Sequence, residues 1–518
     1  MPKIAASQCG TRADETGFGP RLPAFLLPLL AVALIVTNRW FTVIDDEAFI
    51  IDRAAKPVRQ TIQLFLSGAG EHQHPPFYDL LLHEWLRLTN GNMHLLRLLE
   101  IACYVLGAWV LAKAAKRLGG NPSQVYVLWI VALWPYGFHF GRVAVWYSFC
   151  FLLVSLVTLC YLNFLNQATR VNWIWLFLSS VALVYSNYFG WALLGCLALD
   201  FAIRNAKCVA TWWMPFLGTG ALLLIAYAPL FAAFLTEMHH GPHADFYALS
   251  LAANGVYNLY CLFVSESVAP WYWIAGASAG LAIAVCLILT LLSSSWPVRR
   301  FLLYFAGLFF VMTVLGVIQP KRVMLISPWL ILALGVTLAT LPQRFARQTI
   351  LASLICIAVI GWFGILSRNL YAAPRWIEPW DQVAQVATEV IHNGGIVIGN
   401  NPSFFFYMTY ALPASNLGAR HTFEGLLPSV SRTGVFDPTQ WLNAGRPLGQ
   451  TTLLVKGLHF DIPSGPTDAA ENWLDLHCNL ENSEHLVHDP GAKWKQRFAP
   501  QTGQLEWRIE IRSYSCPR

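Results

Sequence analysis

The chain has 518 residues, of which 56% are hydrophobic and 12% charged, whereas about a quarter of the residues in an average soluble domain are charged. The net charge of +6 is small for this length, and no basic cluster interleaved with aromatic residues lies on a polar segment, which argues against a nucleic-acid partner. This composition excludes an ordinary soluble fold and predicts a protein embedded in a lipid bilayer.

Eleven apolar segments follow a polar N-terminal stretch of residues 1–21, and a membrane span needs about 20 predominantly apolar residues. We expect a polytopic α-helical membrane domain over residues 22–367. The segments are Leu22–Ile44, His94–Ala114, Ser123–Phe140, Val143–Phe164, Trp173–Tyr185, Tyr188–Ile203, Trp212–Leu235, Trp271–Leu292, Phe301–Ile318, Val323–Leu341 and Ile350–Leu366.

The Lys and Arg residues of the short connections predict the orientation, because cytoplasmic loops of membrane proteins are enriched in both. A cytoplasmic N-terminus makes every second connection cytoplasmic, and those connections carry the basic residues. Two long loops, 45–93 and 236–270, and the tail after residue 367 are then expected outside. The basic residues are Lys113, Lys116, Arg117, Arg170, Arg204, Lys207, Arg299, Arg300, Arg344 and Arg347.

The first apolar segment has an alternative interpretation as a signal peptide, because basic residues precede it and Ala31-Val32-Ala33 offers a small-residue site. Removal of that segment would place the basic loops on the outer side of the membrane, against the expected enrichment of Lys and Arg in cytoplasmic loops, so we expect a membrane span.

The tail, residues 368–518, has a mixed polar composition and is expected to form an extracytoplasmic α/β domain. Its pattern predicts a helix over Trp380–His392, a strand over Ile396–Gly399 and a further strand in the closing stretch QLEWRIEIRSY. Its two cysteines, Cys478 and Cys516, are expected to face an oxidising compartment and are candidates for a disulfide. The eleven cysteines of the chain include no CxxC pair, so zinc ribbons are not predicted.

The loop after the first segment concentrates polar residues that can do chemistry. It begins with the carboxylates Asp45, Asp46 and Glu47, which are either a solvated helix end or part of a site. The stretch EHQHPPFYDLLLHEWLRL follows, in which two prolines fix a turn before an amphipathic helix that carries Tyr78 and His83.

Metal binding in the outer loops is not predicted. His72, His74, His83 and Glu84 are possible ligands, but the HExxH arrangement of zinc proteases is absent. A divalent cation at the carboxylates remains an alternative without further support. The second loop holds His239, His240 and His243, which we interpret as exposed polar residues.

Three cations interrupt connections that should be poor in positive charge, namely Arg142, Lys321 and Arg322. Lys and Arg are natural partners of phosphate oxygens, so an anion at the outer headgroup level would explain them. The alternative is that their long side chains extend to lipid headgroups at a helix end.

These motifs together resemble the GT-C membrane glycosyltransferases, in particular the bacterial protein O-mannosyltransferase and aminoarabinose transferase group. The Asp-Glu pair of that family falls on Asp46 and Glu47, its His-Pro-Pro on His74–Pro76, an Arg of the second segment on Arg97, and the basic residue before the tenth segment on Arg322.

The chain departs from the family in two places. Relatives often show Glu-Ala-Arg-x-Tyr after the third segment, where this chain has VAVWY, so Val143 and Val145 replace the charges while Tyr147 is kept. His-Tyr-Phe is replaced by Asn187-Tyr188-Phe189. Arg142 lies one turn from Val145, so we interpret it as a candidate to replace the missing Arg, whereas the second carboxylate has no evident replacement.

The resemblance implies a sugar transfer from a polyprenyl-phosphate donor to a hydroxyl of a lipid, glycan or protein acceptor, on the outer face of a bacterial inner membrane and without a cofactor. Asp46 and Glu47 are implied as the catalytic carboxylates, with Asp46 as the general base of an inverting attack, and Arg322, Lys321 and Arg142 are implied as the phosphate-binding residues. Further substrate-binding candidates are Asp45, His74, Tyr78, His83, Arg97, Tyr147, Asn187 and Tyr188.

Two other functional classes explain the sequence less well. A transporter or flippase of lipid-linked sugars would place binding residues near the bilayer midplane and often has repeated halves, neither of which is evident. A membrane-anchored scaffold would leave the carboxylates and the His-Pro-Pro motif without a role.

Overall fold

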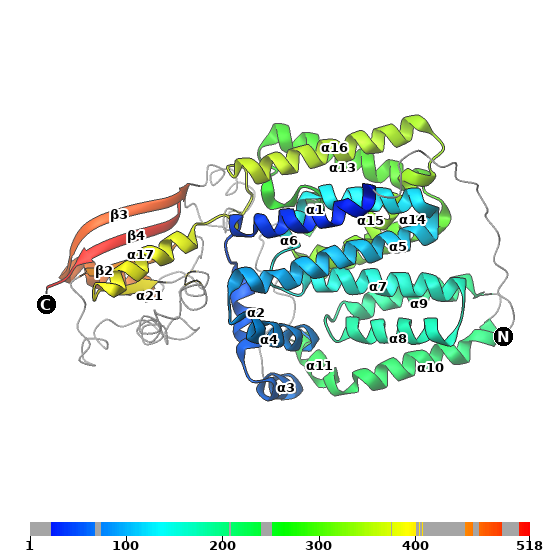
Figure 1. Cartoon of the computed structure of the whole chain (residues 1–518), viewed down its shortest axis with the longest axis horizontal. Coiled ribbons are helices and arrows are strands. Elements are labelled where there is room, and N and C mark those ends of the chain that lie inside the picture. Colours follow the sequence, from blue (N-terminus) through cyan, green and yellow to red (C-terminus); the bar gives the residue numbers. More distant parts are fainter. Residues whose placement is uncertain are drawn as a thin grey trace. The chain divides into compact units, whose positions relative to one another are not determined.

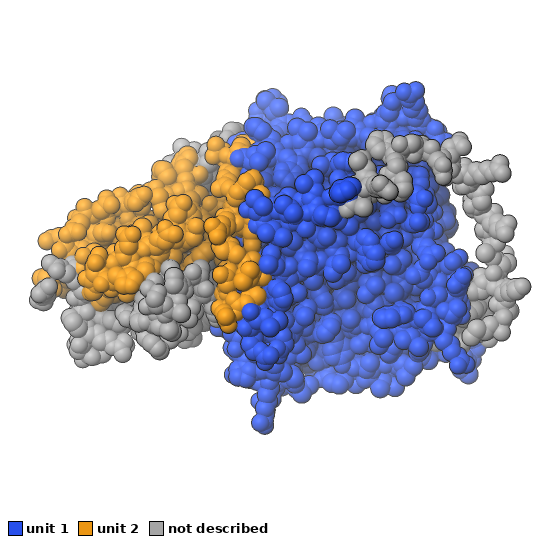
Figure 2. Space-filling view, viewed as in Figure 1, with its two compact units in different colours: residues 1–36, 51–88, 96–366 blue, residues 37–50, 89–95, 367–518 orange. Residues whose placement is uncertain are grey.

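The computed structural model describes residues 22–67, 74–206, 209–239, 251–373, 376–399, 404, 407, 451–458, 466–488 and 507–517. The chain divides into two units, drawn blue and orange in Figure 2. Unit 1 comprises Met1–Val36, Ile51–Leu88 and Leu96–Leu366, and unit 2 comprises Thr37–Ile50, Thr89–Leu95 and Ser367–Arg518. Each unit is described by itself.

Unit 1 is helical, and most of its long helices run side by side in Figure 1. The α-helices at its N-terminal side are α1 (Leu22–Val36), α2 (Asp45–Ala55), α3 (Val58–Ser67), α4 (Phe77–Thr89), α5 (Met93–Leu133), α6 (Pro135–Phe140), α7 (Tyr147–Asn166), α8 (Arg170–Val184), α9 (Gly190–Arg204) and α10 (Val209–Tyr227), of which α2 and α5 begin with residues of unit 2. They are followed by η3 (Ala228–Leu230), α11 (Phe231–His239), α12 (Leu251–Val264), η5 (Ser265–Ser267), α13 (Trp273–Ser293), α14 (Trp296–Val314), η6 (Arg322–Leu325), α15 (Ser327–Thr340) and α16 (Arg344–Ser367).

A helix lies over each of the eleven apolar segments, and six helices in the described part of the chain are long and apolar enough to cross a membrane. One of these, α5, covers both the second and the third segment. Its helical geometry is broken at Gly119 and Gly120, and Gly120 has a φ of 77°, which favours glycine. The six are Met93–Leu133, Tyr147–Asn166, Phe216–Thr236, Trp273–Ser293, Trp296–Val314 and Arg344–Ser367.

Two predicted helix boundaries were wrong, and one connection contains a helix that the sequence analysis did not predict. The third segment does not continue as one helix to Phe140, because α5 ends at Leu133 and Pro135 opens the separate helix α6. The fourth helix begins at Tyr147 and not at Val143, because the residues before it make tight turns. The loop 236–270 contains α12.

The centre of unit 1 is formed by α7 and α15. All side chains of α15 from Ser327 to Leu338 are buried, and the indole N–H of Trp329 donates a hydrogen bond of 2.9 Å to the hydroxyl of Thr158 in α7. Peripheral helices instead expose apolar residues, such as Leu281 in α13 at 68% and Val359 in α16 at 62%. Exposed apolar faces of this kind fit a lipid environment.

A buried ion cluster ties α7, α9 and α14 together. The carboxylate of Asp200, which is 2% exposed, lies 2.6 Å from Arg300 and 2.8 Å from Arg204. It also accepts hydrogen bonds from the hydroxyls of Tyr161 at 2.5 Å and Tyr304 at 3.0 Å. Four donors around one carboxylate compensate its removal from water, so this cluster stabilises the helix packing.

Unit 2 contains η1 (Asn38–Trp40), α17 (Trp380–His392) and α21 (Pro466–His477) beside a sheet of β1 (Ile396–Gly399), β2 (Thr451–Gly457), β3 (Asn479–His488) and β4 (Trp507–Ser515). The strand order is β1-β2-β4-β3, with β1 parallel to β2 and the other pairs antiparallel. The predicted helix over Trp380–His392 and the strand over Ile396–Gly399 are confirmed, as is the strand near the end of the chain.

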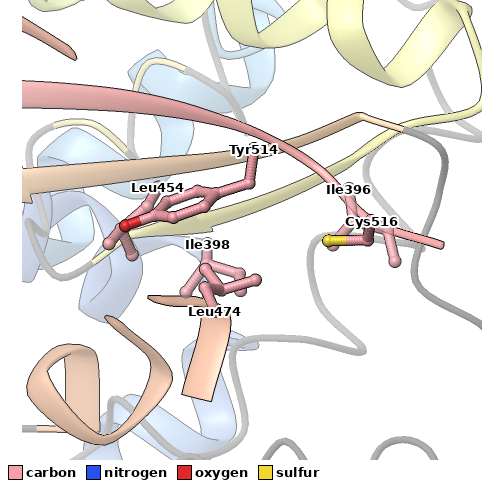
Figure 3. Packing of buried hydrophobic residues seen from close by; sticks show 6 residues of the cluster. All are labelled: Ile396, Ile398, Leu454, Leu474, Tyr514 and Cys516. Carbon is pink, nitrogen blue, oxygen red and sulfur yellow. The ribbon is translucent and has the colours of Figure 1, made fainter. Parts of the chain in front are cut away.

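The core of unit 2 lies between the sheet and α21 (Figure 3). Cys478, just before β3, and Cys516, just after β4, form a disulfide, as the sequence indicated. The turn into β1 requires glycine at position 395, where a Cβ atom would lie 2.6 Å from the carbonyl oxygen of Thr451. The core residues are Ile396, Ile398, Leu454, Leu474, Tyr514 and Cys516.

Candidate functional site

The N-terminus of α2 holds the carboxylates that the sequence singled out. The Oε2 atom of Glu47 accepts a hydrogen bond of 3.1 Å from the backbone N–H of Ile44, and Glu47 is fully buried. This is the contact that a Glu at the third helical position makes with the N-cap residue in a capping box. Glu47 therefore fixes the start of the helix, whereas Asp46 is half-buried. The side chain of Asp45 lies outside the described part of the structure.

Contacts within unit 2 hold the backbone that leads into α2. The backbone N–H of Val43 donates to the hydroxyl of Tyr407 at 3.1 Å. The N–H of the preceding Thr42 donates to the carbonyl oxygen of Trp376 at 3.0 Å. The start of α2 is thus anchored on both sides, by these bonds before it and by the cap at Glu47.

The second half of α2 is fastened to α4 within unit 1. The guanidinium of Arg53 binds Asp79 at 2.6 Å and 2.8 Å, in a two-pronged contact. Burial raises the pKa of the Asp79 carboxyl, and the charge of Arg53 offsets part of that rise. The Nδ1 atom of His83 lies 2.7 Å from the carbonyl oxygen of Ala54. His83, a substrate-binding candidate in the sequence, therefore joins the two helices.

The structure brings three of the separate sequence motifs together. The ring of His74, from the His-Pro-Pro motif, lies 4.7 Å from the ring of Trp146 and 6.4 Å from that of Tyr188, measured between centroids. Trp146 belongs to VAVWY and Tyr188 to Asn-Tyr-Phe. The side-chain oxygen of Asn187 accepts the backbone N–H of Phe189 at 2.9 Å, so Asn187 shapes that turn.

Arg142 is fully buried beside the C-terminal end of α6. Its Nε and Nη2 atoms donate to the carbonyl oxygen of Phe138 at 3.1 Å and 2.8 Å, and its Nη1 donates to that of Leu34 in α1 at 3.3 Å. The guanidinium also lies over the Phe138 ring, 4.2 Å from its centroid. A cation at the carbonyl end of a helix is favourable, which accounts for this charge inside the protein.

The short helix α6 also holds the segment that carries the other two cations. The hydroxyl of Tyr136 donates to the carbonyl oxygen of Pro320 at 2.6 Å and lies 3.3 Å from that of Lys321. Arg322 begins η6, is half-buried and donates from Nη1 to the carbonyl oxygen of Val317 at 3.1 Å. Arg142 and the Lys321-Arg322 pair are therefore positioned by one buried helix.

A further polar contact of α6 joins it to η5. The Nδ1 atom of His139 lies 2.6 Å from the hydroxyl oxygen of Ser265, and both residues are fully buried. Ser265 has a φ of 64°, in the left-handed region that non-glycine residues rarely adopt. Sequence reasoning missed this pair, since the two residues are 126 positions apart.

Sequence reasoning also missed Glu100, a fully buried carboxylate in α5, one turn after the buried Arg97. Burial, and next the charge of Glu100, raise the pKa of Tyr78 well above its ordinary value, so this tyrosine remains protonated beside the carboxylate. An ionisable residue within an apolar segment is the signal that could have identified it.

No three His, Cys, Asp or Glu side chains come close enough to hold a metal ion within the ranges that the structure describes. His72, His240 and His243 lie outside those ranges.

Two solved structures of ArnT from Cupriavidus metallidurans share this fold over almost their whole length. The apo structure matches with a TM-score of 0.54, and the structure bound to undecaprenyl phosphate with 0.55. In both comparisons the identity is 13%, and the match covers 95% of this chain and 97% of ArnT.

The chain has the GT-C fold of membrane glycosyltransferases. The arabinofuranosyltransferase AftD from Mycobacteria matches with a TM-score of 0.49 and 14% identity, over 98% of this chain and 41% of AftD. No family model and no curated protein sequence matches the chain. The GT-C assignment therefore rests on the three-dimensional arrangement and not on sequence similarity.

Proposed function

We propose that the protein is a membrane glycosyltransferase that moves a sugar from a polyprenyl-phosphate donor to an acceptor hydroxyl, with inversion at the anomeric carbon. The observation that carries this proposal is the likeness to ArnT over nearly the full length of both chains, because one of the ArnT structures holds undecaprenyl phosphate. A lipid-linked donor suits a membrane enzyme, since its tail can stay in the bilayer while its phosphate reaches the site.

Asp46 is the proposed general base. An acceptor hydroxyl is a poor nucleophile until its proton is removed, and a carboxylate can accept that proton as the new C–O bond forms. The capping contact of Glu47 supports the choice of Asp46, because Glu47 already holds the start of α2 through its hydrogen bond to the Ile44 N–H. Asp46 is the half-buried member of the pair.

Arg322, Lys321 and Arg142 are proposed to stabilise the negative charge that grows on the departing polyprenyl phosphate. Arg142 binds a carbonyl oxygen of α6, and Tyr136 of α6 binds the backbone just before Lys321. Both contacts support this role, because cations that are already held in place need no rearrangement when negative charge develops on the phosphate. His74 and Tyr188 are proposed to line the sugar site, and Tyr147, Arg97, Tyr78 and His83 are further candidates for substrate binding.

We further propose eleven membrane spans, a cytoplasmic N-terminus, and an active site and tail on the outer face of a bacterial inner membrane. The helices over all eleven apolar segments support the number of spans. The disulfide between Cys478 and Cys516 supports an oxidising compartment for the tail. The acceptor is a hydroxyl of a lipid, glycan or protein.

The experiment that tests the function compares Asp46→Asn with the wild type in a deletion strain. Mass spectrometry of its glycolipids and glycans identifies the sugar that the wild type restores, and purified protein then gives rates. Asn is nearly isosteric but cannot accept a proton, so the rate should fall by about a hundredfold to ten-thousandfold.

Two controls separate catalysis from capping. Asp45→Asn should be milder than Asp46→Asn, because the family motif aligns with Asp46 and Glu47. Glu47→Gln keeps an oxygen that can accept the Ile44 N–H and should retain most of the activity. If Asp45→Asn alone is inactive, the base is Asp45, and if every variant remains active, the proposed mechanism is wrong.

A further inference from the structure

Residues 42–44, which lead into α2, have no regular secondary structure, so their backbone hydrogen bonds come from other parts of the chain. The N–H of Thr42 donates to the carbonyl oxygen of Trp376 at 3.0 Å. The N–H of the next residue, Val43, donates to the hydroxyl of Tyr407 at 3.1 Å. Both partners lie in the tail, and 364 positions separate Val43 from Tyr407. The tail therefore determines where this part of the backbone lies.

These two bonds lie inside unit 2 and are shielded from water. All four residues that form them are buried. Residues 37–50 belong to the same compact unit as the tail and share its orange colour in Figure 2. Removing a partner at such a place leaves a buried N–H group unsatisfied, which is costly. The backbone is then expected to move until that group finds another partner.

The end of this segment is the beginning of α2. The carbonyl oxygen of Ile44 accepts the N–H of Ala48 at 3.2 Å, which is the first bond of the helix, and the N–H of Ile44 donates to Glu47. Asp46 lies in this first turn, three residues after Val43. A hydrogen-bonded turn fixes the backbone dihedrals of its residues, so a displacement at Val43 is transmitted to Asp46.

We propose that Tyr407 is a positioning residue, whose hydroxyl fixes the backbone at Val43 and thereby holds Asp46 within reach of the acceptor hydroxyl. This inference rests on the proposed function, in which Asp46 is the general base. A base must lie within hydrogen-bond distance of the proton it removes, and a misplacement of about 1 Å can cost about a hundredfold in rate. The tail is then part of the catalytic machinery, because it sets the position of the base.

The test uses the full-length purified protein with Tyr407→Phe, which keeps the ring and removes the oxygen that accepts the Val43 N–H. Tyr514→Phe is the matched control, because it is the same change at a buried tyrosine in the core of the same unit (Figure 3). The Tyr514 hydroxyl donates to Asp475 at 2.8 Å. Both variants lose a hydrogen bond of unit 2, and only the bond of Tyr407 leads to Asp46.

Rates are measured with the donor and acceptor that the deletion strain identifies, and the backbone is followed by hydrogen exchange of the peptide that covers residues 42–47. Tyr407→Phe should lower kcat on the order of tenfold to a hundredfold and leave the donor KM within about twofold, because the base is displaced while the donor still binds. Exchange of the peptide should become faster. Tyr514→Phe should keep the wild-type kcat and the wild-type exchange of this peptide.

A double variant separates positioning from packing. If the Tyr407 hydroxyl acts through Asp46, it has no base to position in Asp46→Asn. Tyr407→Phe/Asp46→Asn should therefore turn over at the rate of Asp46→Asn alone. A hydroxyl that serves only packing would lower the rate by the same factor with Asp46 present or replaced.

A wild-type kcat in Tyr407→Phe, a loss confined to the donor KM, or the same proportional loss with and without Asp46 would overturn the inference while the proposed base stands. A Tyr407→Phe protein that does not fold would also count against it, since the hydroxyl would then serve folding. An Asp46→Asn protein with the wild-type rate would instead refute the proposed base of the reaction, and the inference with it.

Discussion

Removing the hydroxyl of Tyr136 tests whether α6 positions the basic pair. Tyr136→Phe keeps the ring, whose contacts with Trp134 and Phe140 lie at centroid distances of 4.9 Å and 4.6 Å. The change deletes the hydrogen bonds of the hydroxyl to the carbonyl oxygens of Pro320 at 2.6 Å and Lys321 at 3.3 Å. Because Lys321 and Arg322 follow Pro320 directly, the variant loosens them without altering their charge.

The size of the effect follows from burial. Tyr136 has no exposed surface, so losing its hydrogen bonds should cost about 1–3 kcal/mol of stability. If donor binding has to order the loosened segment again at a free-energy cost of about 1 kcal/mol, donor binding weakens about fivefold. The expected result is therefore a moderate loss of thermal stability together with a several-fold weaker undecaprenyl phosphate titration.

The control is Tyr161→Phe, the same chemical change at a tyrosine that is 3% exposed. Its hydroxyl donates to Asp200 at 2.5 Å, and it lies fourteen residues beyond Tyr147 on α7, about 21 Å along the helix axis. Stability should fall by at least as much, with donor binding unchanged. Unchanged donor binding in Tyr136→Phe, or equal weakening in both variants, would refute the positioning argument.

Two further predictions concern the tail. Replacing Cys478 and Cys516 with Ala should destabilise unit 2 by about 4 kcal/mol, because the disulfide closes a loop with a sequence separation of 38. Limited proteolysis of this variant should cut the tail faster than the helical unit. Equal cleavage rates would contradict the prediction. Alkaline phosphatase fused to the C-terminus should be active in intact cells; an inactive fusion, with a fluorescent protein at the same place folding in the cytoplasm, would reverse the proposed topology.

The sequence alone predicted the features that depend on composition and local pattern. Apolar segments are recognisable because the bilayer imposes a minimum length on each of them. The helix over Trp380–His392 and the strand over Ile396–Gly399 were predicted to the residue, since periodicity and turn signals are local. The disulfide was foreseeable because the tail contains only two cysteines.

The local sequence pattern gave a wrong prediction where an apolar stretch forms tight turns and not a helix. The stretch Val143–Trp146 is apolar and was assigned to a helix, yet it forms tight turns. Closely packed glycines on its N-terminal side, such as Gly137 against the Tyr104 hydroxyl, allow α6 to lie against α5. Hydropathy measures whether a segment is apolar and not whether its backbone is helical, so it cannot separate the two cases.

The contacts of the individual candidate residues depended on tertiary structure. The sequence selected Asp46, Glu47 and Arg142 as chemical groups, but only the fold assigned Glu47 to a helix cap and Arg142 to the end of α6. Such roles are set by partners distant in sequence, and one chain read alone does not specify which distant segments pack together. The sequence therefore determined that the fold is helical and apolar enough for a membrane, and which chemical groups are available, because both depend on composition and local pattern. The tertiary structure decided which partners those groups contact, because the partners are distant in the sequence.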